Sequence, residues 1–167
     1  MSLSMYQASI PAFIKILNNL SAILDKAASH AEAKKIDLSV FVNARLAPDM
    51  FPFSRQIQIA TDSVKGCAAR LSGTEPPSYP DTESTFPELK ARIAKTVAFL
   101  QSFKPAQIDG SEERKITVKM RSGDMNFLGK PYLFEWVIPN FYFHVITAYD
   151  ILRHNGVDIG KMDFLGA

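Results

Sequence analysis

The sequence has little cysteine, no block of like charges and no uninterrupted apolar run of membrane length. Cys67 is the only cysteine among 167 residues, which excludes an internal disulfide and predicts a reducing, cytoplasmic location. Lysine and arginine number 19 against 17 acidic residues, and no stretch gathers five or six charges of one sign. Neither a nucleic acid nor an anionic membrane is therefore an expected partner.

The most apolar segment, YLFEWVIPNFYFHVITAY at 132–149, is interrupted by Glu135, Pro139, Asn140 and His144. A membrane span needs about 20 nearly uninterrupted apolar residues, so we expect none here. The first residues show neither a basic leader nor a cleavage pattern of small residues, which argues against a signal peptide. With 47% hydrophobic residues, the chain can bury one sizeable core, and we expect a single domain over 1–167.

Four segments repeat apolar residues at helical spacing. The first, over 4–31, opens with Ser4 and Gln7 at capping-box spacing and should bend at Pro11. The second begins near Pro52, with Asp49 placed to cap it, and ends at Gly73. The third has a capping box at 85–88, and the last runs over 131–155 with a kink at Pro139. One short helical turn is expected within 34–52.

Between Ile116 and Phe127 the apolar period changes from 3.6 to 2, and Ser122-Gly123 offers a tight turn. This pattern predicts a β-hairpin. The segment GTEPPSYPDTES at 73–84 has three prolines and no period, so it is a surface crossing between helices. We therefore predict an all-α fold, a four-helix bundle with a small β-hairpin inserted before the last helix, and leave the spatial order of the helices open.

His144 lies in the middle of the apolar face of the last helix, one turn after Asn140, and we expect it to be buried. A buried imidazole needs partners for both nitrogens, from Asn140, another helix, water or a metal. A hydrogen-bonded core histidine is the favoured interpretation. Gln56 edges the apolar face of the second helix and would satisfy His144 through a hydrogen bond. Cys67 lies in the middle of the same helix, on its apolar face, and we expect its thiol to be buried and inert.

The histidine spacing argues against a shared metal ion. A second histidine one turn after His144 would complete a metal-binding pair, but position 148 is alanine. His154 is ten residues away, about 15 Å along a helix, whereas two nitrogens on one zinc ion lie within about 4 Å. We expect His154 to interact with the negative end of the helix dipole and His30 to face solvent. No Ser/His/Asp, phosphate-loop or paired-acid motif stands out.

The opposite face of the last helix is also apolar, with Tyr142, Phe143, Ile146 and Tyr149. Either this helix is central or its second face meets another subunit. We favour a homodimer through this aromatic outer face. The alternative is coverage by the C-terminal segment VDIGKMDFLGA and the hairpin.

Three stretches resemble a known family: MSLSMYQASIPAFIKILNNLSAILDKAASHA at the start, NARLAPDMFPFSRQIQIATDSVKG at 43–66 and PNFYFHVITAYDILRHNGVDIGKMDFLG at 139–166. They are similar to the bacterial domain-of-unknown-function family DUF1993 in the DinB/YfiT-like superfamily. The resemblance implies a DinB-type bundle, usually dimeric. It also implies a divalent metal held by one histidine of the second helix and a His-x-x-x-His pair of the fourth, with thiol transfer or isomerisation in some members.

Residue by residue, His144 matches the first histidine of that pair, Ala148 stands in place of the second, and Gln56 or Gln58 takes the position on the second helix. We therefore expect a metal-free module without a cofactor that binds a small ligand or thiol around Gln56, Asn140 and His144.

Two alternatives remain open. In a metal-dependent enzyme, resembling a thiol transferase or isomerase, His144 would act with an acid such as Asp49 or Asp62, as a ligand for zinc, nickel or iron or as a general base. His144 is then the candidate catalytic residue. A purely structural or interaction protein would have no pocket beside His144.

Overall fold

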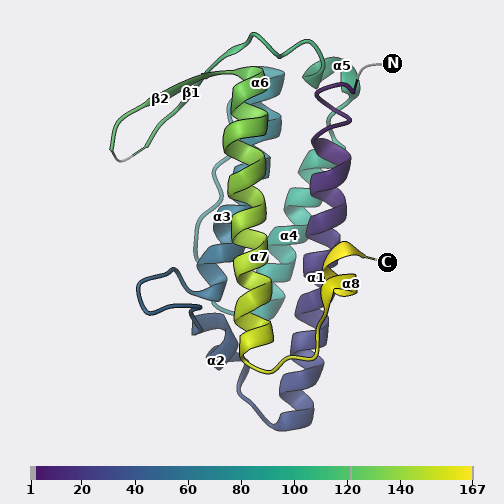
Figure 1. Cartoon of the computed structure of the whole chain (residues 1–167), viewed down its shortest axis with the longest axis vertical. Coiled ribbons are helices and arrows are strands. Elements are labelled where there is room, and N and C mark those ends of the chain that lie inside the picture. The colour runs from purple at the N-terminus through teal and green to yellow at the C-terminus, as the bar shows by residue number, and fades with distance from the viewer. Residues whose placement is uncertain (1–2, 121, 167) are drawn as a thin grey trace.

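The computed structural model describes residues 3–120 and 122–166, which form a helical bundle with a hairpin projecting from one end (Figure 1). Its four long helices are α1 (Ile10–Lys34), α3 (Phe53–Ser72), α4 (Phe86–Gln101) and α7 (Ile138–His154). Shorter helices connect or flank them: α2 (Leu38–Asn43), α5 (Pro105–Ile108), α6 (Gly129–Pro131) and α8 (Lys161–Leu165). The predicted four-helix bundle with a β-hairpin before the last helix is confirmed.

The start of α1 differs from the prediction. Ser4 and Gln7 do form the expected reciprocal pair, with both nitrogen–oxygen distances at 3.3 Å. Regular helix begins only at Ile10, however, so Pro11 lies in the first turn. Proline is tolerated there because the first amides of a helix have no intrahelical acceptor. Pro11 therefore fits the first turn of α1, where it breaks no hydrogen bond of the helix.

The ends of α3 and α4 follow local rules with one exception. The N-cap of α3 is Pro52, and no side chain caps it, so the expected cap by Asp49 is wrong. Gly73 ends α3 with φ of 79°, a left-handed conformation that costs glycine little. The N-cap of α4 is Thr85, and Glu88 completes the predicted capping box.

Packing contacts set the order of helices around the bundle. α4 packs against both α1 and α3, and α7 packs against both α3 and α1, which closes the ring. The Phe53 and Phe86 rings, at the starts of α3 and α4, lie 5.5 Å apart. These two helices are therefore parallel, and the proline-rich crossing returns the chain along the bundle between them (Figure 1).

The last long helix is continuous from α6 through a π-helical segment, η1 (Tyr132–Val137), into α7. Pro139 lies in the first turn of α7 and cannot donate to the carbonyl four residues earlier. The wider turn immediately before it accommodates this missing bond. Figure 1 shows one rod from α6 to α7 without a sharp break, so the structure has a π-helical segment where a kink was predicted.

The hairpin pairs β1 (Lys115–Val118) with β2 (Met125–Leu128) in antiparallel register, with Lys115 opposite Leu128 and Val118 opposite Met125. Ile116 and Val118 are buried, as the two-residue period predicted. Residue 121 of the connecting turn lies outside the described residues. The hairpin projects beside the α6 end of the last helix (Figure 1).

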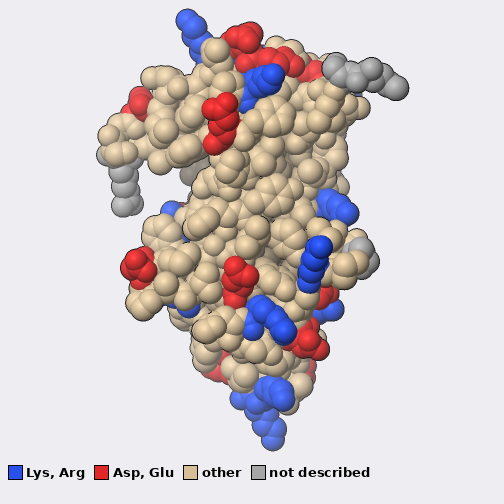
Figure 2. All heavy atoms as spheres, in the orientation of Figure 1, with Lys and Arg blue, Asp and Glu red and all other residues tan. Residues whose placement is uncertain are grey.

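The outer face of α7 is partly covered. The Tyr149 hydroxyl donates to the Ile159 carbonyl at 3.3 Å, and its ring meets Phe164 of α8 edge to face. Phe143 and Ile146 stay 55% and 44% exposed. Figure 2 shows that the surface over the middle of α7 is largely uncharged. The C-terminal segment thus covers part of this face, and the homodimer stays a prediction.

No described helix combines the length and apolar character that crossing a membrane requires.

Candidate functional site

A cavity of about 530 Å³ lies between α3, the η1–α7 helix and the hairpin, within the range of small-molecule sites. Its lining combines apolar and aromatic side chains with polar side chains of α3 and α7. Its lining residues are Phe51, Arg55, Ile59, Asp62, Ser63, Arg70, Val118, Lys119, Met120, Tyr132, Trp136, Val137, Asn140 and His144.

His144 lines this cavity from α7 and is 8% exposed, so the helical period placed it correctly. Its Nδ1 lies 2.6 Å from Oε1 of Gln56 on α3. The Gln56 side-chain nitrogen in turn donates to the carbonyl of Phe51 at 2.9 Å. Gln56 does not line the cavity: it is 1% exposed and lies behind the imidazole. Its role is to hold the ring.

This hydrogen-bond chain sets the protonation of His144. Because the Gln56 amide nitrogen donates to Phe51, its oxygen faces Nδ1, and Nδ1 must carry the hydrogen. Burial, and next the positive charge of Arg55, lower the pKa of His144 from 6.5 to about 4. The ring is therefore neutral at pH 7, and Nε2 keeps a lone pair that can accept a hydrogen bond.

Asn140 lines the same cavity, but its side-chain hydrogen bond goes to α3 and not to His144. Its Nδ2 donates to the Ser63 hydroxyl on α3 at 2.9 Å. The structure thus contains two separate polar bridges between α3 and α7, Gln56–His144 and Asn140–Ser63. Both bridges border the cavity, since His144, Asn140 and Ser63 all line it.

The other residues predicted for the site either lie away from the cavity or already form hydrogen bonds or ion pairs with other side chains. Gln58 donates to Glu83 and accepts from Arg55, so it faces the crossing segment instead of His144. Asp49 does not line the cavity. Asp62 does, but its Oδ1 accepts from Arg92 at 2.8 Å and from Lys65 at 2.7 Å. A carboxylate bound by two cations is a poor partner for His144 as general base.

The remaining two histidines and the cysteine do not line the cavity beside His144. His154 lies in the last turn of α7, as predicted, and is exposed. His30, expected to face solvent, is half-buried, with its ring 6.4 Å from that of Phe41. Cys67 is fully buried, and burial raises the pKa of its thiol far above the ordinary value, consistent with an inert side chain.

Sequence reasoning missed a buried charge network beside the cavity. The Arg92 side chain of α4 is 1% exposed and pairs with Asp62, Asp81 and Glu83 at 2.8–3.1 Å. Its Nε also donates to the Thr61 hydroxyl at 2.8 Å. The network fixes the proline-rich crossing to α3 and α4. An arginine between the apolar positions of α4 was the available signal, but its partners lie on an aperiodic segment.

The polar groups at the hairpin end of the cavity were not predicted from the sequence either. Arg70 donates through Nη1 to the Tyr132 hydroxyl at 3.1 Å. Burial raises the pKa of Tyr132 to about 12, so this phenol keeps its proton at neutral pH. Lys119 at the end of β1 lines the same region. The glycine at 66, inside α3, was a signal for Arg70, because interior glycines are costly in helices.

The three-histidine metal site that the resemblance implies does not fit these residues. Ala148 is fully buried and offers no ligand atom. The 2.6 Å between Nδ1 and Oε1 is a hydrogen-bond distance, shorter than two ligand atoms adopt around an ion at about 2.1 Å from each. Within residues 3–120 and 122–166, no three His, Cys, Asp or Glu side chains gather in metal-binding geometry.

Comparison with known proteins shows to which family the chain belongs. No curated protein matches its sequence significantly. A crystal structure of a DinB family member protein from Shewanella denitrificans is similar, with 43% identity and a TM-score of 0.89 over 97% of this chain and 92% of that one. The model of the family described as Domain of unknown function (DUF1993) matches residues 5–165. The chain therefore belongs to this family of DinB-like bundle proteins.

Proposed function

We propose that this protein binds a small organic molecule, without a metal ion, in the cavity beside His144. The observation that carries the proposal is the fixed, neutral imidazole in the wall of a cavity of about 530 Å³. A ligand site of this kind combines apolar walls with a few oriented polar groups. Trp136, Val137 and Ile59 supply apolar surface here, and His144 and Asn140 supply the polar groups.

The chemistry of the wall defines what such a ligand offers. Nε2 of His144 accepts a hydrogen bond, because Nδ1 holds the only ring hydrogen at neutral pH. A hydroxyl, amide or thiol group of the ligand is a matching donor. Nδ1 is committed to Gln56, which prevents the ring from turning and pre-organises Nε2 for the ligand. Small thiols belong in the set of test compounds because of the superfamily resemblance.

A ligand screen tests the proposal with a matched histidine pair. Small organic molecules, low-molecular-weight thiols included, are added to ¹⁵N-labelled protein, and binding is measured from the backbone amide signals in every variant, with the His144 ring resonances as an added report of the site where that residue is present. We expect compounds that shift these resonances to bind wild type and His154→Gln equally and to lose binding in His144→Gln. His154 is a suitable control because it is an exposed histidine on the same helix. Equal binding to all three proteins would contradict the proposal.

Elemental analysis tests the metal-free part separately. Protein purified without chelators or a metal-affinity tag should contain zinc, nickel and iron well below one equivalent. A near-stoichiometric metal that is lost in His144→Gln would overturn this part and favour the alternative, a metal-dependent enzyme in which His144 acts with other ligands.

A further inference from the structure

Arg70 is placed by an unusual feature of α3. Gly66, one turn earlier, is buried inside the helix, where glycine costs stability relative to alanine. A Cβ atom at position 66 would overlap the guanidinium of Arg70. The glycine therefore makes room for the Arg70 side chain to lie back along its own helix, where Nη1 reaches Tyr132.

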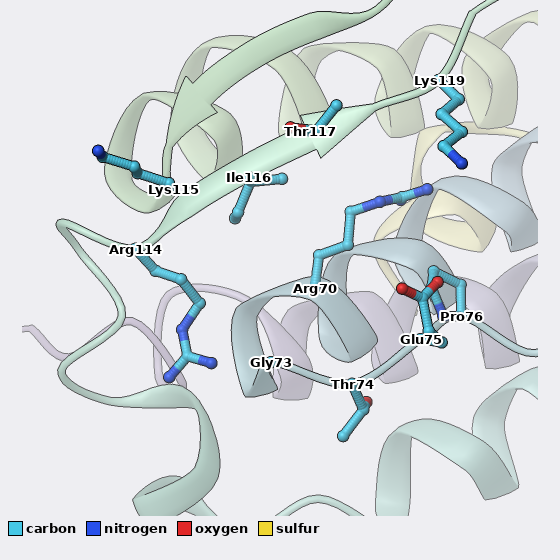
Figure 3. A pocket seen from close by; sticks show the side chains of 10 residues that line it. All are labelled: Arg70, Gly73, Thr74, Glu75, Pro76, Arg114, Lys115, Ile116, Thr117 and Lys119. Carbon is cyan, nitrogen blue, oxygen red and sulfur yellow. The ribbon is translucent and has the colours of Figure 1, made fainter.

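Lys119 approaches the same place from the hairpin. Arg70 and Lys119 both line the His144 cavity, and both also line a neighbouring pocket of about 410 Å³. Figure 3 shows this pocket, in which the Arg70 guanidinium extends toward Lys119 while Arg114 lies on the other side, next to Gly73. The two cations thus stand where the cavity and the pocket meet.

These two cations differ in their pairing from Arg55, which also lines the cavity. Arg55 forms a salt bridge with Asp81. Among the residues that the structure describes, neither Arg70 nor Lys119 forms a salt bridge, although Glu75 lies in the same pocket. Two neighbouring cations that line one cavity and form no salt bridge with a described residue attract an anionic group, and a guanidinium binds carboxylate or phosphate through two hydrogen bonds.

We infer that Arg70 and Lys119 form an anion-binding subsite of the His144 cavity, and that the ligand is a small organic anion carrying a carboxylate or phosphate group. This inference rests on the proposed function and narrows its substrate class. The anionic group lies between Arg70 and Lys119, next to the protonated Tyr132 hydroxyl, and the body of the ligand extends along Trp136 toward His144.

Anion titration of the full chain tests the subsite. Inorganic phosphate and acetate are titrated at low ionic strength against wild type, Arg70→Gln and Lys119→Gln, with the side-chain NMR signals of arginine and lysine as the readout. Lys15→Gln is the control for net charge, because Lys15 is exposed on α1. We expect each cavity substitution to weaken binding about tenfold and the control to leave it unchanged, since each removes a charge-assisted contact. Tighter binding of phosphate or of acetate identifies which group the ligand carries.

Gly66→Ala provides a second test that does not depend on removing a charge. Alanine favours the helix, so the unfolding midpoint should be equal or higher, while the displaced Arg70 guanidinium weakens anion binding about tenfold. Anion affinities that are the same in wild type, Arg70→Gln and Gly66→Ala, or an absence of saturable binding to wild type, would overturn the inference.

The two proposals fail in distinguishable ways. If organic compounds shift the His144 resonances but anion affinity does not depend on Arg70, only the subsite is wrong. If anion binding depends on Arg70 but no organic compound reaches His144, the proposed function is wrong.

Discussion

The Oε1 atom of Gln56 lies 2.6 Å from Nδ1 of His144, across the interface between α3 and α7. The two residues are 88 positions apart in the sequence, and both are buried. A neutral amide at this position leaves the imidazole uncharged, whereas a carboxylate would favour a charged one. The partner of His144 therefore decides whether this ring acts as a neutral acceptor or as a cation.

The substitution Gln56→Glu should raise the pKa of His144 from about 4 back to or above the ordinary range of an imidazole. The reason is that a carboxylate next to Nδ1 stabilises the charged ring by direct attraction and by accepting its hydrogen bond. NMR titration of the ring resonances measures this change. Gln56→Ala is the comparison, because it removes the acceptor without adding charge and should leave the pKa low. A His144 pKa unmoved by Gln56→Glu would show that the two side chains are not in contact.

Stability should fall in mildly acidic solution because of His144. The folded-state pKa of about 4 lies below the ordinary 6.5, so the unfolded chain binds the proton first as the pH falls. The free energy of unfolding then decreases from about pH 6.5 down to about pH 4 and levels off below. Between pH 7.5 and pH 5 the loss should be about 2 kcal/mol.

Urea unfolding of wild type and His144→Gln at several pH values isolates this contribution. Glutamine does not titrate, so the difference in unfolding free energy between the two proteins should narrow as the pH falls through this window. A difference that stays constant from pH 7.5 to pH 5 would contradict a buried, neutral His144.

The helical period was enough to predict the burial of His144 and its pairing with Gln56. Placing His144 on the buried face needs only the position of the helix and 100° per residue, and Gln56 lies on the facing helix at the edge of its apolar face. The partner of Asn140 was not predictable in the same way. Whether it meets His144 or Ser63 depends on how far α3 and α7 are rotated about their axes, which side-chain packing sets.

Features that depend on distant aperiodic segments escaped prediction altogether. Asp81 and Glu83 lie on the proline-rich crossing, and nothing in the local pattern indicates that it folds back onto Arg92. Arg70 and Lys119 line one cavity only because the hairpin lies beside the end of α3. The chain order of these elements was predictable, but the contacts between them depend on the ring order α1–α4–α3–α7, which periodicity does not define.

Removing the buried cation of the Arg92 network should destabilise the fold strongly. In Arg92→Met, Asp62, Asp81 and Glu83 keep their charges but lose the guanidinium that binds all three. Breaking a buried ion pair from one side costs about 3–5 kcal/mol, although the partial exposure of Asp62 and Asp81 places this case at the lower end. Denaturant unfolding measures the loss.

Lys95→Met is the matched control for Arg92→Met. Like Arg92, Lys95 lies over the ring of Tyr79, with its Nζ 4.0 Å from the ring centre. Unlike Arg92, it is exposed on α4 and forms no salt bridge with any described residue. Its loss should cost less than about 1 kcal/mol. Equal effects of the two substitutions would mean that the network does not hold the crossing segment.

The uncovered part of the α7 outer face gives the last prediction, that two copies of the chain associate through it. Phe143 and Ile146 are 55% and 44% exposed, and Figure 2 shows few charges on the surface over the middle of α7. A symmetric dimer buries the same patch on both subunits, so one added charge appears twice in the interface. Phe143→Glu should therefore convert a dimer into a monomer, as measured by size-exclusion chromatography with light scattering. Leu3→Glu, a control at an exposed apolar position outside this face, should stay dimeric. A wild-type protein that is monomeric at micromolar concentration would show that this face serves no subunit contact.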